Sequence, residues 1–99
     1  MGNFELLKTA IQNREVVRFI YDGFPREVEP FLIGDTRTRK LALRGFQIGG
    51  DSNSGKVFDW HLFLLDKISC LTKTGRHFSG VRQNYNPSDK GMLDIYVRI

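Results

Sequence analysis

The chain has 99 residues, of which 40% are apolar, and a chain of this length supports one hydrophobic core rather than two. Fifteen basic and eleven acidic residues leave a net charge of +4, which favours encounters with polyanions without identifying one. The only cysteine, Cys70, excludes an intramolecular disulfide, and its apolar neighbours predict a buried thiol. The sequence shows neither a secretion leader nor a run of about 18 apolar residues. We therefore expect a cytoplasmic protein without a membrane partner.

The first predicted element is a helix over residues 3–12. Apolar residues recur there at helical spacing, and Asn3 is a candidate N-cap. The next residues, 15–21, are β-branched and aromatic and predict a strand that ends at the Asp22–Gly23 turn.

The following segments predict further short strands, separated by turn residues. We expect strands at 26–33, 39–48, 57–65 and 67–72, and Pro30 places an edge or a bulge in the first of these. Residues 76–91 are polar and irregular, and 93–99 alternate as a closing strand. The pattern predicts one domain over 1–99: a mainly β fold in which an antiparallel barrel of five to six strands, with its main body over 15–72, follows an N-terminal helix.

Large apolar side chains on one face of these strands define the expected core. Trp60 and Phe63 are also assigned to the core, whereas Phe46 and Tyr85 are expected to be partly exposed rings. The remaining expected core residues are Val17, Phe19, Val28, Leu43 and Leu65. The carboxylates of Glu27 and Glu29 are expected to be solvated.

Residues suited to catalysis or metal binding lack a telling arrangement. Ser52 and Ser54 lack the strand–turn–helix context of a catalytic nucleophile. His61 has no partner acid at a characteristic spacing. His61, His77 and Cys70 lack the paired spacing of a structural zinc site. We therefore expect no enzyme, no metal site and no cofactor.

The most informative stretch joins a basic strand to a loop rich in glycine and serine. No acid occurs between Thr36 and Gly50, while the loop at 49–55 offers backbone and hydroxyl donors. An anionic ligand would suit this combination. Basic residues also protect an edge strand from pairing with another sheet, and that alternative remains open.

Several short motifs resemble the WYL domain family of bacteria. The helix and first strand contribute L-x-x-A-I-x-x-x-x-x-V-x-F-x-Y, and R-x-V-x-P follows at Arg26, Val28 and Pro30. The run L-A-L-R-G-F at 41–46 stands in the place of the naming Trp-Tyr-Leu, and F-L-L-D-K-I at 63–68 parallels F-R-L-D-R-I. The resemblance implies an SH3-like or Sm-like barrel preceded by a helix.

The chain departs from this family at its usual ligand surface. Leu41 and Ala42 replace the naming Trp and Tyr, and Leu64 replaces a basic residue. The chain instead resembles short members of the family that carry Q-x-G-G-x-S-x-S-G followed by W-x-L-F. We infer a site displaced toward that loop.

WYL domains serve as ligand-sensing or nucleic-acid-contacting modules in transcription regulation and phage defence. The resemblance therefore implies a non-enzymatic regulatory module that binds an anionic ligand, a nucleotide or a single-stranded nucleic acid, on a basic face. Its expected site residues are Arg37, Arg39, Lys40, Arg44, Gln47, Ser52, Ser54 and Lys67. The alternative is a protein-interaction or self-association module that pairs with a regulatory protein or a second copy through an exposed edge such as 94–99.

Overall fold

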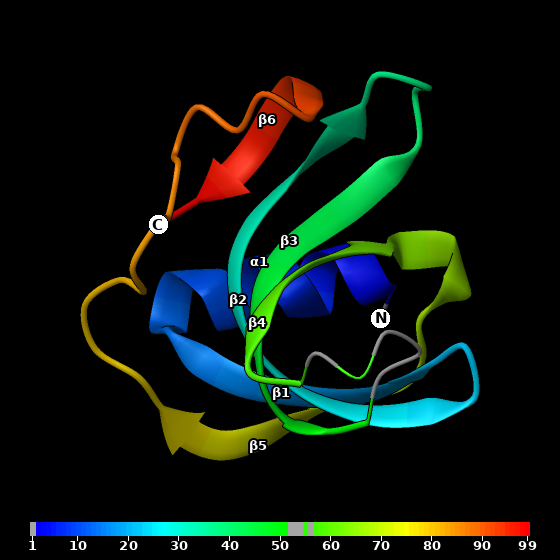
Figure 1. The fold of residues 1–99 in the computed structure, drawn as a ribbon, viewed down its shortest axis with the longest axis vertical. Coiled ribbons are helices and arrows are strands. Elements are labelled where there is room, and N and C mark those ends of the chain that lie inside the picture. Colours follow the sequence, from blue (N-terminus) through cyan, green and yellow to red (C-terminus); the bar gives the residue numbers. More distant parts are fainter. Residues whose placement is uncertain (1, 52–54, 56) are drawn as a thin grey trace.

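The computed structural model describes residues 2–51, 55 and 57–99, which form one helix and six strands (Figure 1). The strands are antiparallel to their neighbours, and the fold is mainly β. The elements in chain order are α1 (Asn3–Asn13), β1 (Glu15–Tyr21), β2 (Phe24–Thr36), β3 (Leu41–Gly50), β4 (Asp59–Leu64), the 3-10 turn η1 (Leu65–Lys67), β5 (Ser69–His77) and β6 (Met92–Arg98).

Strand β2 is the centre of the sheet because it pairs with three other strands. It pairs with β3 along most of its length, with β1 through residues 24–28 and with β6 through residues 32–36. The strand order is β4–β3–β2–β1–β5, and no pairing within the described residues joins β4 to β5. The sheet is therefore open, and the expected barrel closure is not confirmed. Strand β6 pairs beside the C-terminal end of β2 and does not close the sheet (Figure 1).

The bulge predicted at Pro30 lies within β2. The register against β3 shifts between Pro30 and Leu32, so Phe31 is the extra residue in the ladder. A bulge reorients the side chains that follow it. Pro30, Phe31 and Leu32 are all fully buried, which strict alternation over one core would not allow. The sheet thus places apolar side chains on both of its faces.

Helix α1 packs against one face of the sheet through the buried residues Leu7, Ala10 and Ile11. The prediction of Asn3 as the N-cap is wrong, because Gly2 occupies that position. The Asn3 side chain instead donates hydrogen bonds to the carbonyl oxygens of Leu65 and Ile68 and so ties the helix start to η1.

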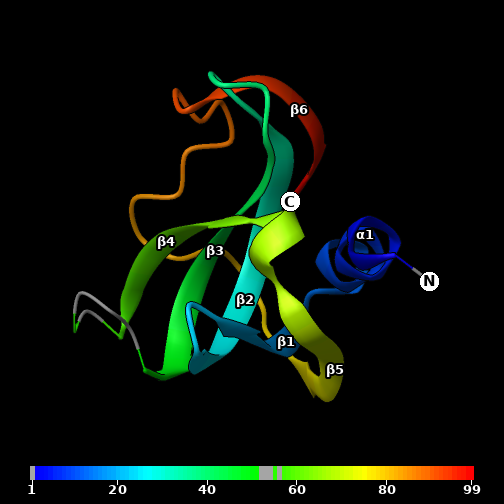
Figure 2. The same cartoon turned by 90° about the vertical axis from the view of Figure 1, so that its right-hand side faces the viewer.

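Two apolar clusters lie on opposite sides of the sheet. The first, beneath α1, contains Ile68 and all of the expected core residues except Trp60, which is only partly buried and packs against the second cluster. The second is built on Phe31, Leu32, Ala42, Phe46 and Met92, with Trp60 and Tyr85 packed against it. Residues 78–91 run over this second cluster, and we call them the strap. Figure 2 shows α1 and the strap on opposite sides of β2 and β3.

Two burial predictions for uncharged side chains are wrong. Phe46 is only 8% exposed, because the Arg82 guanidinium from the strap covers its ring. Cys70 is exposed, because it lies at a bulge of β5, between the pairs Ile20↔Ser69 and Arg18↔Thr72, with a left-handed φ of 55°. Among the described residues, no helix is long and apolar enough to cross a membrane.

Candidate ligand-binding pocket

The structure does not gather the predicted basic residues into one site. Arg37, Arg39 and Lys40 lie exposed on the turn between β2 and β3. The Arg37 side chain donates to the backbone oxygen of Lys90 at 3.1 Å, and Arg39 forms an exposed ion pair with Asp94 at 3.7 Å. Exposed pairs of this kind contribute little free energy and are screened by salt.

The turn and the start of α1 enclose a shallow hollow of about 550 Å³. Arg39 and Lys40 stand on its rim, and Phe4, Leu41 and Leu65 supply apolar walls. Lys67 is exposed in η1 and does not line this hollow. It also does not line the second pocket, which lies beside Arg44 and is described below.

The structure does not support Gln47 as a ligand donor, because its side chain is fully buried and already bonded. Its Nε2 donates to the carbonyl oxygens of Gly49 and Asp51, both at 2.9 Å, and its Oε1 accepts from Arg26 at 3.3 Å. Gln47 therefore shapes the end of β3. Ser52 and Ser54, which were also expected to contact the ligand, lie outside the described residues.

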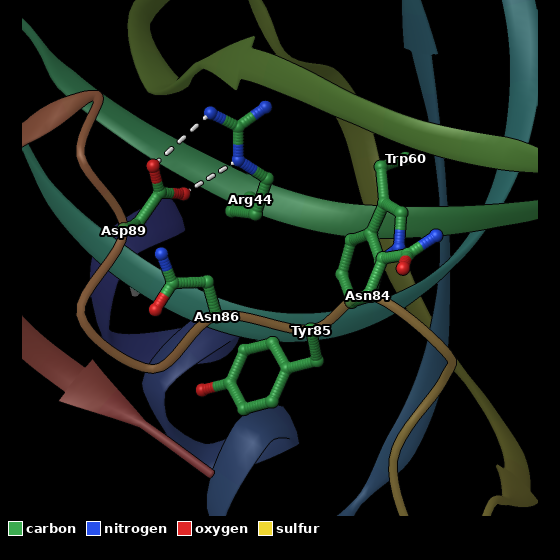
Figure 3. Close-up of a pocket in the computed structure, with 6 residues that line it drawn as sticks. All are labelled: Arg44, Trp60, Asn84, Tyr85, Asn86 and Asp89. Carbon is green, nitrogen blue, oxygen red and sulfur yellow. Dashed lines mark hydrogen bonds and ion pairs between the residues drawn. The ribbon is translucent and has the colours of Figure 1, made fainter.

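Arg44 is the predicted residue that lines a pocket on the strap side of the sheet. Its side chain extends from β3 on the strap side of the sheet, where it borders a cavity of about 250 Å³. Trp60 from β4 forms another wall of this cavity, and the remaining lining residues come from the strap (Figure 3). They are Asn84, Tyr85, Asn86 and Asp89.

Trp60 and Tyr85 form a fixed aromatic wall. Their rings stack with centroids 5.8 Å apart and an interplanar angle of 20°. The Trp60 indole N–H donates to the Gln83 carbonyl at 2.9 Å, and the Tyr85 hydroxyl donates to the Ile99 carbonyl at 3.1 Å. Burial raises the pKa of Tyr85 above the ordinary tyrosine value. Each ring is therefore anchored through its polar atom.

Arg44 and Asp89 form a two-point ion pair across the pocket (Figure 3). The Arg44 Nε lies 2.7 Å from Asp89 Oδ2, and Nη2 lies 3.4 Å from Oδ1. Asp89 Oδ1 also accepts a hydrogen bond from the Gly91 N–H at 2.9 Å. Burial alone would raise the pKa of Asp89, but the hydrogen bonds and charge of Arg44, with the Gly91 bond, outweigh burial and lower it.

Neutral hydrogen-bonding groups complete the pocket. The side-chain amides of Asn84 and Asn86 reach its rim from the strap (Figure 3). Asn84 has a left-handed φ of 71°, a conformation that asparagine tolerates better than most residues. The pocket thus combines an aromatic wall, two amides and an arginine whose Nη1 has no hydrogen-bond partner among the described residues.

A second ion pair fixes the strap to the sheet. Arg82 binds Glu29 through two hydrogen bonds of 2.8 and 2.9 Å, and its guanidinium lies over the rings of Phe46 and Phe58. The Glu29 bond raises the pKa of Arg82. The expectation that Glu29 is solvated is wrong, because the strap covers it to 5% exposure. Glu27 remains at the surface, where it pairs with Arg18 and Arg76.

Most of this pocket was missed by the sequence reasoning. Arg44 and Asp89 are 45 positions apart in the chain, so spacing gives no sign that they meet. The run N-Y-N-P-S-D at 84–89 does contain an aromatic ring, two amides and an acid, which is an unusual density of recognition groups for a loop. This density of recognition groups is the feature of the sequence that could have indicated the pocket.

The proposed pairing edge at 94–99 falls largely within β6. Its register against β2 shifts twice, between Ile33 and Gly34 and between Asp35 and Thr36. Shifts and charged residues are the features by which edge strands resist pairing with other chains. The structure therefore adds no observation in favour of the edge-pairing alternative.

A comparison with protein-family models and searches of curated proteins and of solved structures found no match. Within the described residues, no group of three or more His, Cys, Asp or Glu side chains is placed to hold a metal ion. The pocket is therefore the feature from which a function can be proposed.

Proposed function

We propose that this protein is a non-enzymatic binding module for a nucleotide, either free or at one position of a single-stranded nucleic acid. The observation that carries the proposal is the juxtaposition of Arg44 with the Trp60–Tyr85 wall and the two strap amides. A planar base would contact the aromatic wall, the amides would meet polar groups on its edge, and Arg44 would bind the phosphate.

The chemistry of each group supports this assignment. Stacking of a base on an exposed aromatic ring contributes about 1–3 kcal/mol, and every base has a face suited to it. The planar guanidinium of arginine binds phosphate through two parallel hydrogen bonds. A cavity of about 250 Å³ lies below the usual range for drug-sized ligands, so a nucleotide would be only partly enclosed and the rest of it would face solvent.

We propose that the chain is a WYL-type, SH3-like module that acts as a regulator in the cytoplasm. Its bent sheet follows a single helix, and the R-x-V-x-P motif lies on β2, where Pro30 begins the bulge. We assign the ligand to the strap side of the sheet, because Gln47 at the start of the glycine-rich loop is occupied and Arg44 is the predicted basic residue that lines the pocket.

The experiment uses the intrinsic fluorescence of Trp60, which is the only tryptophan in the chain and lines the pocket. The protein is titrated at low salt with the four nucleoside 5′-monophosphates and with short single-stranded DNA and RNA. We expect a saturable change for at least one of them, weakening as salt rises.

Two arginine variants separate pocket binding from general attraction to positive charge. Arg44→Gln should weaken binding by at least about tenfold, because a hydrogen bond to a charged group is lost. Arg39→Gln removes the same charge on the distant turn and should leave affinity within about twofold. Melting curves of both variants establish that they fold. Absence of saturable binding by the parent, or equal weakening by the two variants, would overturn the proposed function.

A further inference from the structure

The Arg44 guanidinium has an anionic partner within the chain. Asp89 binds two of its nitrogens, and the Asp89 side chain is only 11% exposed. The carboxylates of the pairs Arg18–Glu27, Arg76–Glu27 and Arg39–Asp94 are much more exposed, at 28%, 28% and 57%. Glu29, which pairs with Arg82, is covered as well, at 7%, but it does not line this pocket. Asp89 therefore occupies the position where a ligand anion would bind most favourably.

We propose that Asp89 determines the ligand class of this pocket by competing with the ligand's anionic group for Arg44, so that phosphomonoesters bind and carboxylates do not. This inference rests on the proposed function. A ligand carboxylate that displaced Asp89 would only exchange one carboxylate for another on the Arg44 guanidinium, so the exchange would gain nothing. A phosphomonoester brings a charge of about −1.5 to −2 at pH 7 and three acceptor oxygens, so the exchange is favourable for phosphate.

The covalent attachment of Asp89 makes the competition effective. A group held beside its partner by the chain acts at an effective concentration in the millimolar range or above, so a free carboxylate of equal strength cannot displace it at ordinary concentrations. The ligand must therefore bind the guanidinium more strongly than a carboxylate does, or add contacts elsewhere in the pocket.

The structure also allows Asp89 to move without unfolding the strap. The bonds that fix its oxygens are those to Arg44 and to the Gly91 N–H, which lies two residues away. The strap is held independently at Arg82 by Glu29 and at Tyr85 by the Trp60 ring. Displacement of Asp89 thus requires a shift only in the last part of the strap, before β6 begins at Met92.

The test compares each nucleoside with its 5′-carboxylate and its 5′-monophosphate by the Trp60 fluorescence titration. The informative variant is Asp89→Asn, which removes the charge while its amide oxygen still accepts the Gly91 bond. Asp89→Glu restores the charge and should restore the discrimination. Asp94→Asn removes the same charge at an exposed ion pair and controls for the change in net charge. Melting curves confirm that each variant folds.

For the parent we expect the 5′-monophosphate to bind at least about tenfold more tightly than the 5′-carboxylate, which should bind no better than the nucleoside. In Asp89→Asn both anions should bind more tightly, and the carboxylate should gain at least about tenfold over the nucleoside. Asp94→Asn should retain the parent's ratios.

The possible failures are distinguishable. If the parent binds a monophosphate through Arg44 and Asp89→Asn leaves carboxylate affinity unchanged, this inference is overturned while the proposed function stands. If neither the parent nor Asp89→Asn binds any of these compounds, both are overturned. Equal gains in Asp89→Asn and Asp94→Asn would show an effect of net charge alone and would also overturn the inference.

Discussion

The two glutamates of β2 differ in how far the strap covers them. Glu27 and Glu29 lie two residues apart on β2, yet Glu27 stays at the surface and Glu29 is buried by residues that come more than fifty positions later. A sequence pattern predicts the surface environment of Glu27 well, because that environment depends on the strand alone. The buried environment of Glu29 depends on a tertiary contact with the strap, which local spacing does not encode.

The Arg82–Glu29 pair should be important for stability. Arg82→Ala leaves Glu29 buried without its partner, and loss of one member of a buried pair costs about 3–5 kcal/mol. We expect about 3 kcal/mol, because 35% of the Arg82 side chain is exposed and water can reach part of the site. Urea denaturation measures this change. Arg18→Ala, which breaks an exposed pair, is the control and should cost less than about 1 kcal/mol; equal costs would contradict the role assigned to burial.

The Arg44–Asp89 pair should make stability depend on acid pH. The pKa of Asp89 is lower in the folded protein than in the unfolded chain, so its contribution is present above about pH 4 and is lost as the pH falls through the folded-state value. Asp89→Asn lacks this titration and should lose less stability than the parent between about pH 5 and pH 2.5. Melting temperatures across that range test this, and parallel curves for the two proteins would refute it.

The elements of this fold divide into those that local pattern determines and those that distant contacts determine. Helix α1 and strand β1 follow directly from apolar spacing and β-branched composition, and Pro30 correctly indicated a bulge. Strand β2 is longer than predicted, because its ends are stabilised by β1 and β6 rather than by its own sequence. The pocket was predicted only at Arg44, since its other walls depend on where the strap lies.

At Gly34 the backbones of β2 and β6 lie too close together for a Cβ atom. A Cβ atom there would lie 2.2 Å from the Asp94 carbonyl oxygen, which is backbone and cannot move aside alone. Gly34→Ala should therefore separate β6 from β2 and lower the melting temperature by several degrees, since about 1 kcal/mol corresponds to about 4–8 °C in a domain of this size.

Amide hydrogen exchange provides the specific readout for Gly34→Ala, because protection should fall first in β6 and in the facing half of β2. Gly2→Ala is the control, since a Cβ at Gly2 meets no atom within 4 Å. Unchanged protection of β6 in Gly34→Ala would show that the two strands can separate slightly without loss of pairing.

At the scale of the whole molecule, one sheet separates two apolar clusters of different character. The cluster beneath α1 is closed by a helix and contains most of the fully buried side chains. The cluster beneath the strap is covered by a segment whose Phe78 N–H donates to the carbonyl oxygen of Arg14, which caps the end of α1 and is not part of the sheet. The first cluster should therefore set global stability, while the second shapes the pocket.

Substitutions in the two clusters should have different consequences. Phe63 in the first cluster is 1% exposed, so Phe63→Ala should cost about 3–5 kcal/mol in free energy of unfolding. Trp60 is only partly buried, and Trp60→Ala should cost clearly less while abolishing nucleotide binding, which is measured for this variant by calorimetry. A larger loss of stability for Trp60→Ala would show that the strap cluster carries the global fold.

The pairing of β2 with three strands also has a consequence for synthesis on the ribosome. Strands β1, β2 and β3 are consecutive and can pair as soon as they emerge, but the edge of β2 at residues 32–36 waits for β6, which is translated much later. During that interval Leu32, Ile33 and their neighbours present an apolar, unpaired edge to other nascent chains. The yield of soluble protein should therefore fall when translation through the strap is slow, because the edge of β2 then stays unpaired for longer.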